Sequence, residues 1–182
     1  MLTFYLSLWF LWLVRMFFIT VLIGIFLSAG VTFFIYAKEG FAPLDSDVMA
    51  ALFDIFTFWF ALLVNLALLV ALFINMKHFF NRCYGGFTLR LLSCPKSTES
   101  HIIEEIGYGD LRVLWRKYLL FIVYHTGAFV LVGTLIAYMA HGSASLFAWF
   151  NITFLYLFIG LAGLFSLFVL ANFSKNVRIE KC

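Results

Sequence analysis

Charged residues are scarce in this sequence. Asp, Glu, Lys and Arg make up 12% of the 182 residues, whereas a soluble chain carries about 25%. Hydrophobic residues account for 65% of the chain, and the mean hydropathy is +1.06. A single water-soluble core cannot bury this much apolar surface. The composition therefore excludes a soluble domain and predicts an integral membrane protein with lipid as its main solvent.

Motifs of catalysis and nucleotide binding are also missing. The sequence has no phosphate-binding loop, G-x-S-x-G elbow, H-E-x-x-H zinc motif or dinucleotide fingerprint. No short apolar region is followed by an A-x-A site, so we expect no cleaved signal peptide. The net charge of +3 does not indicate nucleic-acid binding, because the basic residues adjoin apolar segments, where they orient spans and contact headgroups. These absences favour a protein that is not an enzyme.

The three cysteines, Cys83, Cys94 and Cys182, form no obvious disulfide framework. His78, Cys83, Cys94 and His101 are the residue types that bind zinc, but their spacing is not that of compact zinc fingers. Zinc is therefore not favoured, and Cys83 and Cys94 are expected to be reduced thiols. Cys182 is the last residue, so it forms no C-a-a-X prenylation signal.

Four apolar segments are long enough to cross a bilayer whose hydrocarbon core is about 30 Å thick. The fold class predicted is an all-α bundle of four transmembrane helices in one integral membrane domain covering residues 1–182. The expected spans are residues 17–37, 48–74, 119–140 and 146–171. Asp47 or Ser46 is the expected N-cap of the second span.

Residues 2–37 are apolar apart from Arg15. As one helix they would measure about 54 Å, which exceeds the hydrocarbon thickness. We therefore expect a division at Arg15. Residues 2–14 would then either lie in the interface as an anchor or extend the helix to pack on a partner.

The polar connector, residues 77–117, joins the second and third spans. Gly85-Gly86 is expected to break the chain, residues 87–92 to be extended, and a helix to begin after Ser100. Gly107 and Gly109 should interrupt that helix, and Asp110 should cap its restart. The basic residues expected to contact a partner or lipid are Arg82, Arg90, Arg112, Arg116 and Lys117.

Basic residues also predict the orientation. Lys38 is the one Lys or Arg on the side of the membrane opposite the connector. The positive-inside rule then places the connector and both termini in the cytoplasm. The expected location is a bacterial cytoplasmic membrane.

Small residues should mark helix contacts, because lipid provides no hydrophobic drive for helix pairing. Gly24 and Ser28 form such a pair in the first span. The fourth span carries Gly160 and Gly163, followed by Ser166, and the third carries Gly127 and Gly133.

Four polar residues fall within the expected spans: Asp54, Asn65, His125 and Asn151. Asp54 should face the bundle interior, because an ionised carboxylate in lipid is costly, and Asn151 or His141 is its expected partner. It either handles protons or cations or is structural. His125 and Asn65 are expected to form a hydrogen bond, and haem is not favoured, because a b-type haem between spans needs a second buried histidine.

Two functions follow. The leading hypothesis is a non-catalytic subunit or accessory of a larger membrane complex, with lipid, other membrane subunits or a second copy as partners. The alternative is a small oligomeric transporter or channel for protons or cations that uses Asp54, Asn65 and His125.

Overall fold

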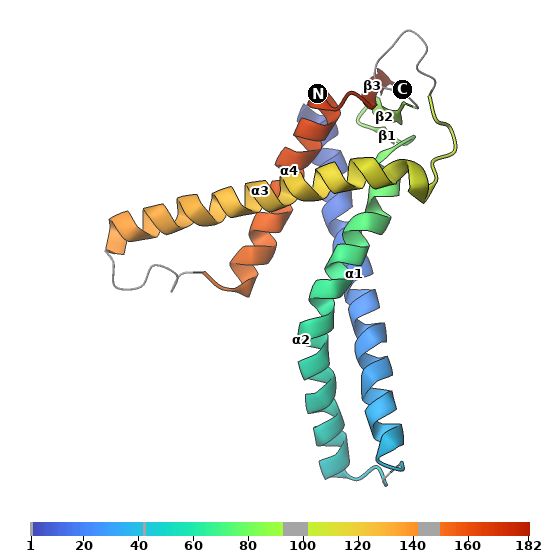
Figure 1. Ribbon diagram of the computed structural model, residues 1–182, viewed down its shortest axis with the longest axis vertical. Helices are drawn as coiled ribbons and strands as arrows, with labels where there is room; N and C mark the ends of the chain where they lie inside the picture. Colours follow the sequence, from blue (N-terminus) through green and yellow to red (C-terminus); the bar gives the residue numbers. More distant parts are fainter. Residues whose placement is uncertain (1, 42, 93–101, 142–149) are drawn as a thin grey trace. The chain divides into compact units, whose positions relative to one another are not determined.

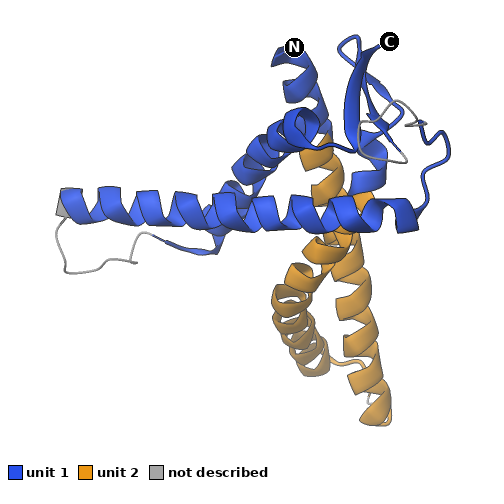
Figure 2. Cartoon of the chain, turned by 45° about the horizontal axis from the view of Figure 1, so that its top comes forward, with its two compact units in different colours: residues 1–11, 76–182 blue, residues 12–75 orange. Residues whose placement is uncertain are grey.

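The computed structural model describes residues 2–41, 43–92, 102–141 and 150–182. The chain forms two compact units: unit 1 comprises residues 1–11 and 76–182, and unit 2 comprises residues 12–75 (Figure 2). The elements, labelled in Figure 1, are α1 (Leu2–Lys38), α2 (Ser46–Met76), the 3-10 helix η1 (Lys77–Phe79), β1 (Cys83–Tyr84), β2 (Phe87–Leu91), α3 (Tyr108–His141), α4 (Ile152–Phe173) and β3 (Val177–Lys181).

Among the described residues, four helices are long and apolar enough to cross a membrane, the same number as the spans predicted. The first three expected spans lie within α1, α2 and α3. The expected fourth span begins too early, because Asn151 precedes the first residue of α4 as its N-cap.

Helix α1 runs without a break through Arg15, and the point in α1 at which the span begins stays a prediction. Bilayer thickness limits how much of a helix lies in lipid, but it does not interrupt backbone hydrogen bonds. No proline lies within α1, and its two glycines are tolerated inside an apolar helix. Residues 2–14 therefore extend the helix, as in the second alternative, rather than forming a separate interfacial anchor.

In unit 2, α1 and α2 pack side by side through small residues (Figure 1). A Cβ added to Gly24 would lie 3.1 Å from Cε2 of Phe60, and Ser28 is fully buried. The predicted contact at Gly24 and Ser28 is confirmed. At the other end of the pair, buried Asn75 donates from Nδ2 to the carbonyl of Trp12 at 2.9 Å.

The N-cap of α2 is Asp45, not Ser46 or Asp47 as predicted. Its Oδ1 accepts a hydrogen bond from the backbone N–H of Val48 at 2.9 Å. This is the N-cap geometry, in which a side-chain oxygen satisfies one of the free N–H groups of the first turn.

In unit 1, α4 packs against the first residues of α1. Trp9 donates from Nε1 to the carbonyl of Gly160 at 2.8 Å, and Asn172 donates to the hydroxyl of Tyr5 at 2.9 Å. Gly160, Gly163 and Ser166 are all buried, which confirms the predicted contact face of α4. Gly127 of α3 has no atom near its Cβ position, so that glycine marks no contact among the described residues.

The chain also contains a three-stranded antiparallel sheet in the order β1-β2-β3, so the all-α prediction is wrong in this part of unit 1. Gly85 and Gly86 form the two-residue turn between β1 and β2, with φ of +54° and +84°. Two adjacent residues with positive φ build the tight turn that matches strand twist, and glycine adopts it without strain. The extended segment predicted at 87–92 is confirmed as β2, which pairs with β3.

The helix predicted after Ser100 does not form in residues 102–107, which lack helical structure. Helix α3 begins at Tyr108, and the Oδ2 atom of Asp110 accepts from the N–H of Gly107 at 3.0 Å. The capping role predicted for Asp110 is therefore confirmed. Gly109 is the second residue of α3, so the interruption predicted there is wrong.

Candidate functional site

A polar pocket of about 540 Å³ lies in unit 1, between two short segments that adjoin long apolar helices. Residues 77–82 form one wall and directly follow α2, and residues 104–107 form the other and directly precede α3. We call it the edge pocket. Its polar lining residues are Lys77, His78, Asn81, Arg82, Glu104 and Glu105.

Apolar side chains anchor the first wall of the edge pocket. Phe79 and Phe80 are 2% and 3% exposed, and the Phe79 ring meets the ring of Tyr118 edge-on. A buried pair of aromatic residues fixes the short turn in which they lie. The polar residues on either side of the pair are thereby left at the pocket surface.

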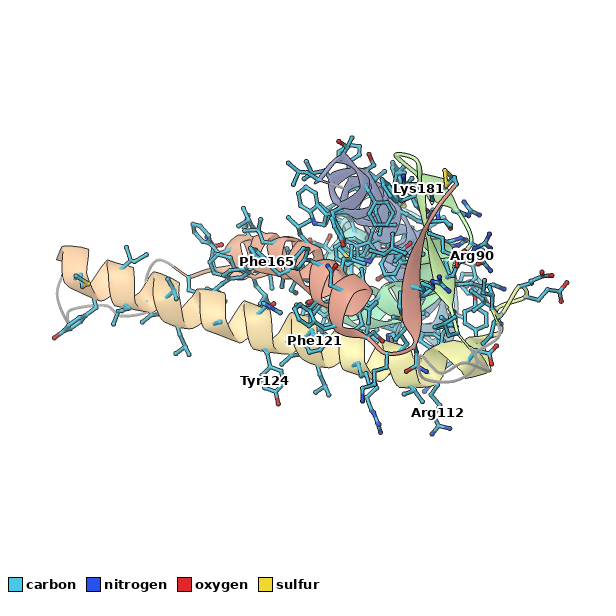
Figure 3. All side chains as sticks on the ribbon, turned by 90° about the horizontal axis from the view of Figure 1, so that it is seen from above. Arg90, Arg112, Phe121, Tyr124, Phe165 and Lys181 are labelled. Carbon is cyan, nitrogen blue, oxygen red and sulfur yellow. A yellow bond between two sulfur atoms is a disulfide. The ribbon has the colours of Figure 1, made fainter. Side chains whose placement is uncertain are left out.

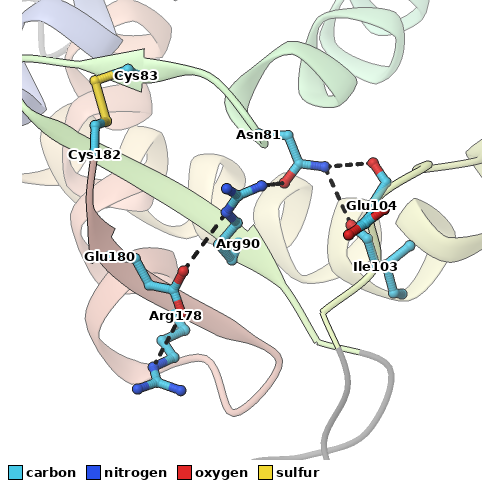
Figure 4. Close-up of polar contacts among 8 residues, drawn as sticks. All are labelled: Asn81, Cys83, Arg90, Ile103, Glu104, Arg178, Glu180 and Cys182. Carbon is cyan, nitrogen blue, oxygen red and sulfur yellow. Dashed lines mark hydrogen bonds and ion pairs between the residues drawn. A yellow bond between two sulfur atoms is a disulfide. The ribbon is translucent and has the colours of Figure 1, made fainter.

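Asn81 holds the two walls together, as Figure 4 shows. Its Nδ2 donates to the carbonyls of Ile103 at 3.2 Å and Glu104 at 2.8 Å, and its Oδ1 accepts from Arg90 at 3.0 Å. Its φ is +57°, a conformation that asparagine adopts more readily than other non-glycine residues. The sequence prediction missed Asn81, because nothing local distinguishes it from an ordinary loop residue.

The two segments that line the edge pocket carry opposite charges. Lys77 and Arg82 lie on the first wall, and Glu104 and Glu105 on the second. Among the described residues, the side-chain ion pairs are Arg90–Glu180 at 3.8 Å and Arg178–Glu180 at 3.6 Å, so none involves these four groups. The Nζ of Lys77 lies 5.5 Å from the centre of the Tyr108 ring.

The other basic residues expected to make contacts differ in their surroundings. Arg90 belongs to β2 and is held by Asn81 and Glu180 (Figure 4). Arg112, Arg116 and Lys117 are exposed on α3, and Arg112 projects away from α4 (Figure 3). These three are accessible to a partner or to headgroups, and the contact itself stays a prediction.

Asp54 and Asn65 lie on one exposed face of α2. They are eleven residues apart, which is close to three turns of a helix with 3.6 residues per turn. The Nδ2 atom of Asn65 donates to the backbone carbonyl of Ala61 at 2.9 Å. The hydroxyl of Thr57 donates to the backbone carbonyl of Phe53 at 2.8 Å. We call the exposed residues Asp54, Thr57, Ala61 and Asn65 the α2 polar face.

His125 and Asn151 each bond within their own helix. The Nδ1 atom of His125 lies 2.7 Å from the carbonyl of Phe121, and its ring stacks on Phe165. Asn151 accepts from the backbone N–H groups of Thr153 at 3.0 Å and Phe154 at 3.1 Å. Asn151 is thus an N-cap rather than a residue one turn inside a span.

The pairings expected of these intramembrane residues, Asp54 with Asn151 and His125 with Asn65, stay predictions. The side chain of His141, the other expected partner of Asp54, is outside the described part of the chain.

Cys83 and Cys182 form a disulfide, with their Cα atoms 6.1 Å apart (Figure 4). The expectation of a reduced Cys83 is wrong. The register of β2 with β3 brings the residue after β3, Cys182, to the turn between β1 and β2, where its N–H donates to the carbonyl of Gly86 at 3.0 Å and its sulfur bonds that of Cys83. A disulfide-bonded sulfur is not a thiolate, so the zinc set loses one of its four ligands. Cys94 and His101 lie outside the described residues.

Comparison of the chain with protein-family models, with curated proteins and with solved structures finds no match.

Proposed function

We propose that this chain is a non-catalytic subunit or accessory of a larger membrane complex. The observation that carries the proposal is the α2 polar face, which presents a carboxylate, a hydroxyl and an amide on the exposed side of a long apolar helix. The occupant proposed is a membrane helix of a partner subunit with a basic side chain at the depth of Asp54.

Charge and helix surface support this occupant. An ionised carboxylate facing lipid at a helix centre costs about 3 kcal/mol, and less near a helix end. Among the described residues Asp54 has no ion pair, so a basic group on a partner helix would neutralise it. Ala61 lies between Thr57 and Asn65 and lets a second backbone approach closely.

The proposed location is a bacterial cytoplasmic membrane with the connector and both termini in the cytoplasm. The distribution of Lys and Arg supports this orientation. The Cys83–Cys182 disulfide favours the opposite one, because disulfides persist in oxidising compartments. In the cytoplasm the same pair would be held mainly as two thiols.

The test is purification of the tagged chain in mild detergent, with mass spectrometry of the chains that accompany it. We expect a stoichiometric membrane partner with the parent and its loss with Asp54→Leu. The matched control is Asp47→Leu, which removes an exposed carboxylate from the first turn of the same helix. A parent that purifies as a single chain with no partner contradicts the proposal, and a complex of identical copies makes self-association the interaction.

The second candidate is proton or cation transport, because Asp54 and Asn65 share one face along three turns of α2. Flux into vesicles containing the purified chain separates the two functions. Transport predicts flux that Asp54→Asn abolishes, whereas the subunit proposal predicts the same background leak for parent and variant.

A further inference from the structure

We infer that the edge pocket binds a phosphoethanolamine group, meaning a phosphate diester joined to a primary ammonium, with the headgroup of a membrane phospholipid as its source. This site is separate from the α2 polar face and does not depend on the partner helix proposed above.

The place of the pocket in the chain favours a headgroup. Helix α2 has 31 residues and is about 46 Å long by its rise per residue. A bilayer with its headgroup layers is about 40–45 Å thick. Lys77 directly follows α2, so the wall that it begins lies at headgroup level when α2 crosses the membrane.

The separation of charge selects the ligand. Lys77 and Arg82 provide a point charge and a planar fork of N–H donors, both of which bind phosphate oxygens. Glu104 and Glu105 of the second lining segment would accept hydrogen bonds from a primary ammonium, which has three donors. A ligand with only negative charge meets repulsion from these acids. A quaternary ammonium carries no N–H and cannot replace those hydrogen bonds.

The pocket is built before any ligand binds. Asn81 fixes the spacing of the walls through its bonds to Ile103 and Glu104, and Arg90 in turn orients Asn81. The volume of about 540 Å³ lies within the range of about 300–1,000 Å³ typical of small-ligand sites. Since the four charged groups form no ion pair among the described residues, a ligand need not break one to enter.

The experiment is lipid binding to the purified full chain, measured by native mass spectrometry with phosphatidylethanolamine, phosphatidylglycerol and phosphatidylcholine of identical acyl chains. We expect phosphatidylethanolamine to bind about tenfold tighter than either of the others. Equal binding of the three lipids overturns the inference, and this comparison needs no variant to fold.

Two double variants test the walls. Lys77→Gln/Arg82→Gln should weaken phosphatidylethanolamine binding about tenfold. Glu104→Gln/Glu105→Gln should remove the preference for phosphatidylethanolamine over phosphatidylglycerol. The matched controls are Lys175→Gln and Glu39→Gln, exposed charges outside the pocket lining, which should keep the preference. A preference that survives Glu104→Gln/Glu105→Gln, or that falls equally in the controls, overturns the inference.

A competition arm identifies the source of the group. Soluble glycerophosphoethanolamine should displace the lipid only at concentrations far above that of the lipid, because it lacks acyl chains. Displacement at equal concentration shows that the site takes the free ester as well and supports the chemical assignment. If neither the lipid nor the soluble ester binds, the inference is wrong.

Discussion

In unit 2 the two helices are held together by close packing and by the buried hydrogen bond from Asn75 to Trp12, whereas unit 1 adds a sheet, a disulfide and ion pairs. In unit 2 the decisive contact is that of Gly24 with Phe60, where a missing side chain lets two backbones approach. In unit 1 the stabilising interactions join residues far apart in sequence, such as the disulfide of Cys83 with Cys182, which are separated by 99 positions. Local sequence patterns, here small residues in an apolar helix, predict a helix contact such as that of Gly24. They do not predict a pairing of distant residues such as Cys83 with Cys182.

Removing the disulfide should have the largest effect and should be confined to unit 1. Closing a loop of 99 residues stabilises a fold by about 4–5 kcal/mol in the chain-entropy model, and measured values are typically about 2–4 kcal/mol. Cys83→Ser should lower the Tm of oxidised protein, as should reductant on the parent. Cys94→Ser is the control and should leave the reductant effect intact.

The same cysteines test the orientation in cells. A maleimide that adds mass to each free thiol should label three cysteines if the sheet is in the cytoplasm. It should label Cys94 alone if the disulfide has formed. Quantitative labelling of Cys94 alone contradicts the cytoplasmic placement of the connector and inverts the topology.

Enlarging Gly24 should break the packing of unit 2. A Cβ added at this position would lie 3.1 Å from Cε2 of Phe60. Gly24→Leu therefore overpacks the contact between α1 and α2 and should destabilise unit 2 by about 1–3 kcal/mol. Gly30→Leu is the matched control, because nothing lies within 4 Å of its Cβ position. Unfolding in mixed micelles measures both, and equal destabilisation by the two variants contradicts the contact.

Asn81→Ala should loosen the edge pocket, because it removes three hydrogen bonds and leaves two carbonyls without this donor. The expected cost is about 1–3 kcal/mol. Hydrogen exchange should rise in residues 102–107 more than in α4. Asn81→Gly keeps the positive φ accessible and separates backbone strain from the loss of the side chain.

Trp9→Phe should have the smallest effect. It removes the hydrogen bond from Nε1 to the carbonyl of Gly160 and retains most of the apolar area. A single hydrogen bond between membrane helices contributes about 0.6–2 kcal/mol. Trp59→Phe on α2 is the comparison in unit 2, and the free energy of unfolding in mixed micelles is measured for both variants. A larger loss of stability with Trp59→Phe than with Trp9→Phe argues against the bond to Gly160.

Hydropathy was sufficient to predict the helices, because each contains a long run of apolar residues. Small residues then located two of the three predicted packing faces, at Gly24 and at Gly160. The division at Arg15 was predicted from thickness alone, and thickness does not decide between the two alternatives for residues 2–14, of which the structure shows the extended helix.

The sheet was beyond the reach of local patterns. Strand β3 (Val177–Lys181) carries three charged residues in five, which reads as a solvated tail until β2 is placed beside it. The disulfide depends on that register, so it was hidden for the same reason. The edge pocket follows from both, because Arg90 of β2 orients Asn81, and Asn81 joins the walls.

The pairing of β2 with β3 has a consequence for biosynthesis. Between Leu91 and Val177 the ribosome must make α3 and α4. At about 5–20 residues per second this takes roughly 4–17 s. During that time β2 lacks its partner β3, and the backbone groups that pair with β3 are left unpaired. Synthesis of α3 and α4 therefore precedes completion of the sheet, and slower elongation prolongs the exposure of an open strand.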